Sequence, residues 1–379
     1  MRGKSGFVLI SIIVALVMLF SACQPQTVVK TVEVEKTVVV EKVVEIEAEK
    51  ELDQEEMAKE FLRGKKICVL FSGVVNDAGW TANGYNGLIN LRDNYGMEFS
   101  YRESVLVEEA ADLMRDFASS GCDIIFAHGF QYADQIDQVA AEHPEIQFAE
   151  TSRGFGKPPN VIGLTLITGE TGYFASRIAG HKTKTGKIAI VAGQIFPSFD
   201  WSIRQARVAA TDMAKAGFVD KPYTVELLEV GSWTDPAKAK ELTAAGIEAG
   251  IDVFIMNSDA SDAGILEAIK AARSQGKEIW GISGVGDKNY LGPDFMIGGW
   301  EERVTNMMKL MALAYASAGG PTYADLPSGI REGTIVFAPS YGLLSDKAEE
   351  DIVATMQCYI KKGLECEMIG DDFEITGEL

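Results

Sequence analysis

The run ICVLFSGVVNDAGWTANGYNGL, from Ile67 to Leu88, decides the fold. Its first part is almost continuously apolar, as expected of a strand buried on both faces of a parallel sheet, and the part after Gly79 is expected to be helical. Trp80 stands in the loop between them. Such loops usually carry small polar residues, so this large indole is either a lid on the core or one half of a ligand sandwich.

The same alternation of apolar strand and amphipathic helix continues along the chain in two similar halves. Further strands are expected at 123–129, 146–151 and 161–166, and, in the second half, at 187–193, 224–230, 252–258 and 278–284. Apolar strands separated by helices predict an α/β protein with mostly parallel sheets covered on both faces. Two such halves in tandem predict two lobes that face each other across a cleft.

The loops that follow these strands carry aromatic and short polar side chains in both halves. In α/β sheets, ligands bind outside the carboxyl ends of the strands, so these loops are candidates for a site. The side chains singled out on this ground are Asp77, Trp80, Phe130, Phe196, Trp233, Asn257, Asp259 and Trp300. One aromatic residue would be assigned to the core, but aromatic residues at so many strand ends favour a cleft that binds a planar ring.

The N-terminus reads as an export signal. Arg2 and Lys4 precede the apolar stretch 7–20, which is shorter than the roughly 20 residues that cross a bilayer. The small residues before Cys23 resemble the lipobox of bacterial lipoproteins. We therefore expect a signal peptide at 1–22 and lipidation of Cys23; an uncleaved anchor helix is the alternative.

Three hexapeptides, KTVEVE, KTVVVE and KVVEIE, follow from Lys30. Valine alternates with charge at period two, which favours extended chain. A single strip of this kind has no partner for its valine face, so we interpret 23–63 as a lipidated N-terminus and charged spacer; a self-associating strip is the alternative.

Charge and cysteine content exclude several classes. Loss of Arg2 and Lys4 with the signal peptide leaves 33 basic and 55 acidic residues, a net charge of −22, which repels nucleic acid. Cys68 and Cys122 open apolar strands and are expected to be buried thiols. Cys358 and Cys366 are a candidate disulfide if the chain turns between them, because eight helical residues span about 12 Å. No spacing resembles a metal site, and no cofactor is expected.

The body, from about Lys66 to Gly363, resembles the basic membrane protein family of bacterial lipoproteins, which includes purine nucleoside receptors. The resemblance rests on DAGWTANGYNGL, ADLMRDFASSGCDIIFAHGF, TGETGYFASRIAG, GQIFPSF and the run from Ser232 to Asp259. It implies a type I periplasmic-binding-protein fold. We accordingly place one lobe at 64–168 and 288–320, and the other at 169–287 and 321–379.

The resemblance also implies roles for individual residues. Trp80 stands where the nucleoside receptors stack a phenylalanine on the purine, and Phe130 and Phe196 stand in the loops expected to supply further contacts. The chain departs from the receptors at Thr81, where they often have asparagine, and at Ser283, where they bind ribose through aspartate. Their lysine near a later helix is matched by Glu301, beside Trp300.

These inferences predict a monomeric, membrane-anchored substrate-binding lipoprotein of an ABC importer, facing outside the cytoplasm on the periplasmic or extracellular side. Its expected ligand is a small planar heterocycle such as a purine nucleoside or nucleobase. Its expected partners are permease and ATPase subunits and, through acylated Cys23, the lipid bilayer. The alternatives are a sensor or surface adhesin with the same cleft, or a nucleoside hydrolase-like enzyme. No nucleophile–base pair supports the enzyme.

Overall fold

The computed structural model describes residues 54–77, 79–338 and 340–374. The chain divides into residues 1–56 and a compact body, Met57–Leu379, which contains both sheets. The expected signal peptide, Cys23 and the hexapeptides lie outside the described residues. No helix in the described ranges is long and apolar enough to cross a membrane.

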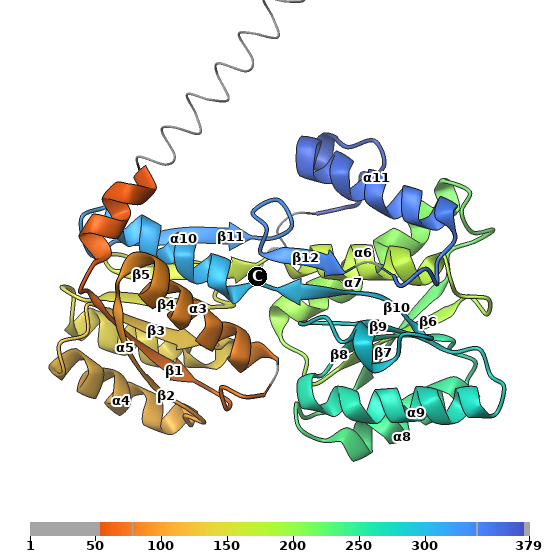
Figure 1. Ribbon diagram of the computed structural model, residues 1–379, viewed down its shortest axis with the longest axis horizontal. Coiled ribbons are helices and arrows are strands. Elements are labelled where there is room, and N and C mark those ends of the chain that lie inside the picture. Colours follow the sequence, from red (N-terminus) through yellow and green to blue (C-terminus); the bar gives the residue numbers. More distant parts are fainter. Residues whose placement is uncertain (1–53, 78, 339, 375–379) are drawn as a thin grey trace, which may run out of the picture. The chain divides into compact units, whose positions relative to one another are not determined.

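Six parallel strands form the first sheet, in the order β11-β5-β4-β3-β1-β2. They are β1 (Lys66–Phe71), β2 (Glu98–Arg102), β3 (Ile124–His128), β4 (Gln147–Thr151), β5 (Val161–Leu166) and β11 (Ala324–Ser328). Helices α3 (Trp80–Tyr95) and α10 (Val304–Ser317) pack together, as do α4 (Val107–Ser119) and α5 (Ala133–Glu142) (Figure 1).

Strand β1 shows why its sequence is apolar throughout. Ile67, Val69 and Phe71 belong to one core, together with residues of α3 and α10. Cys68 and Leu70 belong to another core, together with residues of α4 and α5. Because alternate side chains of a strand point to opposite faces, a sheet covered on both faces requires apolar residues at every position. This confirms the prediction made from the strand sequences.

The second sheet has the order β12-β10-β9-β8-β6-β7, and within it only β10 and β12 pair antiparallel. Its strands are β6 (Lys187–Ala192), β7 (Thr224–Glu229), β8 (Val253–Asn257), β9 (Trp280–Ser283), β10 (Met296–Glu302) and β12 (Ile335–Ala338). Helices α6 (Thr168–Gly180) and α7 (Pro197–Lys215) pack together, as do α8 (Pro236–Glu248) and α9 (Asp262–Ser274). Helices α6 and α7 come closest at Gly172, where a Cβ atom would collide with the carbonyl oxygen of Ser202. The two-lobed α/β fold is as predicted.

The chain passes between the two sheets three times: from β5 into α6, from β10 into α10, and from β11 into β12. This corrects the expected lobe boundaries. Residues 288–320 were placed with the first lobe, but β10 hydrogen-bonds to β9 and β12 in the second sheet, and the chain crosses only at Arg303. Residues 321–379 were placed with the second lobe, but β11 pairs with β5 in the first sheet.

Both pairs of cysteines form disulfides. The expectation of buried thiols at Cys68 and Cys122 is wrong, because the two residues form a disulfide with Cα atoms 5.9 Å apart. Cys68 lies within β1 and Cys122 just before β3, and these two strands are neighbours in the sheet. The candidate bridge between Cys358 and Cys366 is confirmed. Helix α11 (Asp346–Lys362) ends at Gly363, whose φ of 60° supplies the required turn.

Buried polar contacts fasten α11 to α6 and to the third crossover. Arg177 donates two hydrogen bonds to the carboxylate of Asp351, at 2.8 and 2.6 Å. The hydroxyl of Tyr359 donates to Glu170 Oε1, and the backbone N–H of Ile330 donates to Oε2 at 2.6 Å. Glu170 is fully buried at the start of α6, so this one carboxyl group joins three segments that are far apart in sequence.

Burial raises the pKa of Glu170 to about 7, although its hydrogen bonds with Tyr359 and Ile330 oppose the shift. The folded protein thus holds this proton more tightly than the unfolded chain. The resulting stabilisation is complete below the ordinary pKa of 4.5 and is lost as the pH rises through about 7. As the pH rises, this effect lowers the free energy of unfolding by at most ~1.4 kcal/mol per pH unit.

We expect Glu170→Gln, which mimics the protonated acid, to make the free energy of unfolding less dependent on pH between 5 and 8. Urea denaturation at several pH values measures this slope. Glu267→Gln, on the exposed side of α9, is the matched control and should keep the wild-type slope. Equal slopes for wild type and Glu170→Gln would contradict the raised pKa of Glu170.

Candidate ligand-binding site

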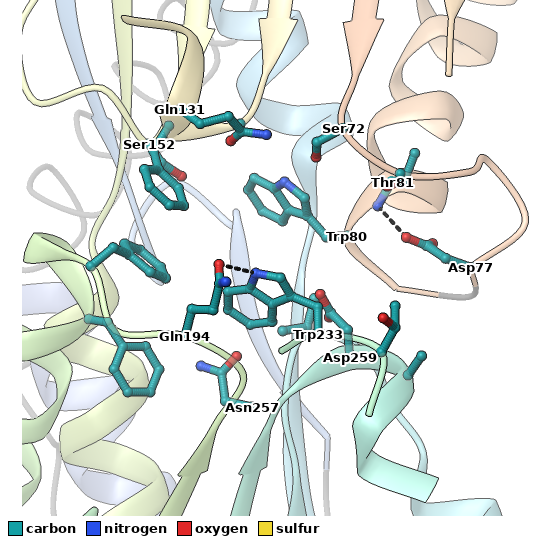
Figure 2. Close-up of a pocket in the computed structure, with 18 of the residues that line it drawn as sticks. Ser72, Asp77, Trp80, Thr81, Gln131, Ser152, Gln194, Trp233, Asn257 and Asp259 are labelled. Carbon is teal, nitrogen blue, oxygen red and sulfur yellow. Dashed lines mark hydrogen bonds between the residues drawn. The ribbon is translucent and has the colours of Figure 1, made fainter. Parts of the chain in front are cut away.

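A cavity of about 670 Å³ opens between the carboxyl ends of the two sheets. From the first sheet it is lined by the loops after β1, β2, β3 and β4, and from the second by those after β6, β7, β8 and β9. Residues at two of the crossovers and on α7 complete the wall: Leu166, Thr168, Glu302, Phe199 and Ser202. Figure 2 shows side chains from these loops pointing into the same space.

Eight of the ten residues singled out from the sequence line this cavity: Asp77, Trp80, Thr81, Phe130, Phe196, Trp233, Asn257 and Asp259. Ser283 and Trp300 do not. Ser283 is fully buried and its hydroxyl donates to Asn289 Oδ1, at 3.4 Å. Trp300 is 2% exposed within the core of the second lobe. Ser283 stands on β9 and Trp300 on β10, and both side chains are packed inside the second lobe.

Trp80 is both a packed residue and a wall of the cavity. One face of its indole stacks on His128, with ring centroids 4.3 Å apart and planes 16° from parallel. His128 Nε2 donates to the carbonyl oxygen of Trp80 at 2.8 Å, and the hydroxyl of Thr151 donates to Nδ1 at 3.1 Å. Burial lowers the pKa of His128 to about 4, so a neutral imidazole supports the indole from behind. The rest of the indole lines the cavity (Figure 2).

Asp77 shapes the loop that carries Trp80. Its Oδ1 accepts from the backbone N–H groups of Gly79 and Ala82, at 2.8 and 2.9 Å, and its Oδ2 accepts from Thr81 at 3.0 Å. A carboxylate at a helix N-terminus satisfies N–H groups that have no partner within the helix. Asp77 therefore fixes the start of α3, a structural role that was not predicted from the sequence.

Aromatic side chains of both lobes meet at one side of the cavity. Phe130, which follows β3, stacks on Phe196, which precedes α7, with centroids 4.8 Å apart and planes 12° from parallel. The ring of Phe196 also lies beside that of Trp233, with ring centroids 6.4 Å apart. The indole N–H of Trp233 donates to Gln194 Oε1 at 3.0 Å, and its ring covers Gly193, which has no room for a Cβ atom. The lobes thus share one aromatic wall.

Three carboxyl groups line the cavity, and none forms a direct ion pair with another described residue: Asp77, which accepts from backbone N–H groups, Asp259 and Glu302. Burial, together with the nearby Asp262, Asp77 and Glu302, raises the pKa of Asp259 to about 7, against the opposing effect of Lys288. Burial likewise raises the pKa of Glu302 to about 7, while the indole N–H of Trp300 donates to its Oε1 at 3.0 Å.

Several polar residues of the cavity were not predicted from the sequence: Ser72, Gln131, Ser152, Gln194 and Glu302. The signal for the first four was their position one to three residues after a strand. Glu302 was not among the predicted residues, because the resemblance matched the lysine of the receptors to Glu301. Adjacent residues of β10 point to opposite faces, and Glu301 instead pairs with Arg303 at 3.3 Å.

No group of three or more His, Cys, Asp or Glu side chains suited to a metal ion occurs in the part of the chain that the structure describes. The residues that line the cavity offer hydrogen bonds, aromatic faces and negative charge as means of holding a ligand.

Comparison with known proteins agrees with this architecture. The chain is 26% identical over 305 residues to the transcriptional activator protein med of Bacillus subtilis, covering 79% of this chain and 90% of that protein. It is 24% identical over 274 residues to a purine-binding protein of Brucella abortus, covering 71% and 69%. The structure of a solute-binding protein of an ABC transporter system from Aeropyrum pernix superposes with a TM-score of 0.65 at 18% identity, covering 78% and 86%.

The model of the Bmp family, described as ABC transporter substrate-binding protein PnrA-like, matches residues 64–365. This range holds both sheets, all three crossovers and every residue that lines the cavity. The chain therefore belongs to the Bmp family of PnrA-like ABC transporter substrate-binding proteins.

Proposed function

We propose that this protein is the lipid-anchored substrate-binding component of an ABC importer, that it acts outside the cytoplasm, and that it binds a small planar, purine-like heterocycle in the cavity between its lobes. The observation that carries the proposal is the set of aromatic faces, supplied by Trp80 in the first lobe and by Phe196 and Trp233 in the second, around one cavity. Such faces favour planar rings, and the few polar groups beside them can fix the orientation of a bound ring.

Several features of the family and the fold support the proposal. The family is one of substrate-binding proteins, and the relative from Brucella abortus is named for purine binding. The crossovers beside the cavity give the lobes a place to bend, and closure of two lobes on a solute is a common way to present it to a permease. No enzymatic turnover is proposed, because substrate binding accounts for the family and for the cavity.

The test is identification of the bound ligand. We expect mass spectrometry of the protein purified without refolding to detect a small heterocycle, and the same compound to raise the melting temperature of protein stripped by partial unfolding. Ribose and glucose are the controls and should have no effect. Stabilisation by a non-planar sugar alone would contradict the planar-ring proposal.

Import is tested separately from binding. Deletion of the gene should abolish uptake of the identified compound by cells. If binding is confirmed and uptake is unchanged, the protein is a sensor or surface receptor with the same cavity. The similarity to a relative named as a transcriptional activator supports this second outcome.

The lipid anchor is proposed from the sequence around Cys23 alone. We expect metabolic labelling with a fatty acid to mark the wild-type protein, and Cys23→Ser to remove the label and release the protein from the membrane fraction. Ser21→Ala, which keeps a small residue before the cysteine, is the control and should remain labelled. Continued labelling of Cys23→Ser would contradict the proposal.

A further inference from the structure

We propose that the ligand is a cation, specifically a planar heterocycle with a protonated ring or amino nitrogen, and that Asp259 accepts a hydrogen bond from that nitrogen. This inference rests on the proposed function, because it names the charge class of the compound that the same cavity takes. It is carried by three observations: the charge of the cavity wall, the unpaired oxygen of Asp259, and the arrangement of the surrounding charges.

The cavity wall is negatively charged. Among the described residues that line it are three carboxyl groups, Asp77, Asp259 and Glu302, and no Lys, Arg or His. A ligand with phosphate or carboxylate groups would find no opposite charge on this wall and three like charges. Neutral ligands are tolerated by such a wall, but only a cation is attracted by it.

Asp259 has a buried oxygen that lacks a partner. Its Oδ1 atom makes no hydrogen bond with any described residue and is shielded from solvent. A buried acceptor without a donor is unfavourable, because it has lost its hydrogen bonds to water and gained none in return. The backbone of Asp259 is also in the left-handed region, with φ 52°, which is uncommon for residues other than glycine. Unfavourable features of this kind concentrate at ligand sites, where they orient a functional group.

Asp259 lies between the lobes. It follows β8 of the second sheet, yet a Cβ atom added at Gly79, in the loop of the first lobe that leads into Trp80, would be 3.3 Å from its Oδ1. Figure 2 shows the Asp259 carboxyl group beside Trp233, in the space between that ring and the loop of Asp77. A ligand ring held by the aromatic faces would therefore present its edge to this carboxylate.

The nearest described cation is committed elsewhere. Lys288 donates to Asp262 Oδ2 at 2.7 Å and to the carbonyl oxygen of Gly284 at 3.3 Å. Asp262 Oδ1 in turn accepts from the N–H and hydroxyl groups of Ser258, at 3.0 and 2.7 Å. Lys288 and Asp262 thus form a pair that leaves the charges of Asp259 and Glu302 without a direct counter-ion.

The aromatic faces suit a cation as well. A positive charge over an indole ring is attracted by the negative face of the ring, and two tryptophans, Trp80 and Trp233, point into this cavity. Aromatic walls combined with carboxylates are a common arrangement for binding organic cations.

The charge state of the site varies with pH in a predictable direction. With pKa values raised to about 7, Asp259 and Glu302 are largely protonated at pH 5.5 and ionised at pH 8. The charged groups that face Asp259 are Lys288, Asp262, Asp77 and Glu302. A cation binds the ionised site, so its affinity should rise as the pH rises through about 7.

The test uses three planar probes of nearly equal size at pH 8: 4-aminoquinoline, which is protonated and has N–H donors; 1,4-dimethylquinolinium, which is permanently charged without N–H donors; and neutral 4-methylquinoline. Isothermal titration calorimetry on protein stripped of ligand should give the tightest binding for 4-aminoquinoline, at least tenfold tighter than for 4-methylquinoline, a difference of about 1.4 kcal/mol. The permanently charged probe should bind with intermediate affinity, and more weakly at pH 5.5 than at pH 8.

Two variants locate the effect. Asp259→Asn should bring the affinities of 4-aminoquinoline and 4-methylquinoline within about threefold of each other, and asparagine tolerates the left-handed backbone. Glu302→Gln keeps an acceptor for Trp300 and should reduce the preference in part. Asp200→Asn is the control: it removes an exposed carboxylate of α7 that does not line the cavity, and it should leave the affinities of all three probes unchanged.

The outcomes separate the two proposals. Equal or tighter binding of 4-methylquinoline would overturn the cation inference and leave the planar-ring function standing. An undiminished preference in Asp259→Asn would also overturn the inference. Failure of all three probes to bind would overturn the inference together with the proposed planar ligand.

Discussion

Replacing Trp80 with alanine should weaken ligand binding by well over tenfold. An aromatic pair contributes about 0.5–1.5 kcal/mol beyond the area that it buries, and the indole is the largest side chain that the first lobe presents to the cavity. The measurement is calorimetric titration of the compound identified by mass spectrometry, with quenching of tryptophan fluorescence as a second readout.

The stacking of Trp80 on His128 changes what is expected of stability. Trp80 is half-buried and covers an imidazole. Its replacement by alanine should therefore lower the free energy of unfolding by part of the roughly 3–5 kcal/mol found for Trp→Ala in a packed core. Trp80→Phe is the matched control, because a phenyl ring can still contact His128 and still face a ligand. Binding of the folded Trp80→Ala variant within threefold of wild type would show that Trp80 only covers the core.

Removing the disulfide between Cys68 and Cys122 should destabilise the protein more than removing the one between Cys358 and Cys366. The first closes a loop with a sequence separation of 54, the second one of 8. The loss of loop-closure entropy in the unfolded chain corresponds to about 4 kcal/mol for the longer loop and about 2.5 kcal/mol for the shorter.

The comparison uses the two double alanine variants, each measured by urea denaturation beside the wild type. Each variant is the other's control, because each removes two sulfur atoms and one crosslink. Reduction of the wild type should reproduce the sum of the two effects. Four titratable thiols in the denatured, unreduced wild type would contradict both bridges.

The strands and the two-lobed fold were predictable from the sequence, because a strand buried on both faces has a distinctive apolar run. Ile67 to Phe71 shows this directly, with alternate residues in two different cores. Pairing between strands is not encoded so locally. The adjacency of Cys68 and Cys122 depends on β1 and β3 being neighbours, and the places of β10 and β11 depend on hydrogen bonds between distant segments.

The candidate site was predictable to the extent that it depends on position at or after the end of a strand, as for Asn257, which ends β8, and Trp80, which follows β1. The error at Trp300 arose because an aromatic residue within a strand and one after a strand look alike in sequence. Glu302 could not be told from Glu301 without the register of β10. Contacts between lobes, such as the stack of Phe130 on Phe196, join loops that have no shared sequence signal.

The three crossings between the sheets also govern the order in which the protein can fold. Strand β11 completes the first sheet, yet it is made 158 residues after β5 ends, as the positions of Leu166 and Ala324 show. While the ribosome extends the chain, the first lobe therefore lacks its edge strand until nearly seven-eighths of the sequence has emerged. Contacts of such high sequence separation slow folding. A nascent chain with this connectivity therefore cannot complete either sheet until β11 and β12 have been made, late in its synthesis.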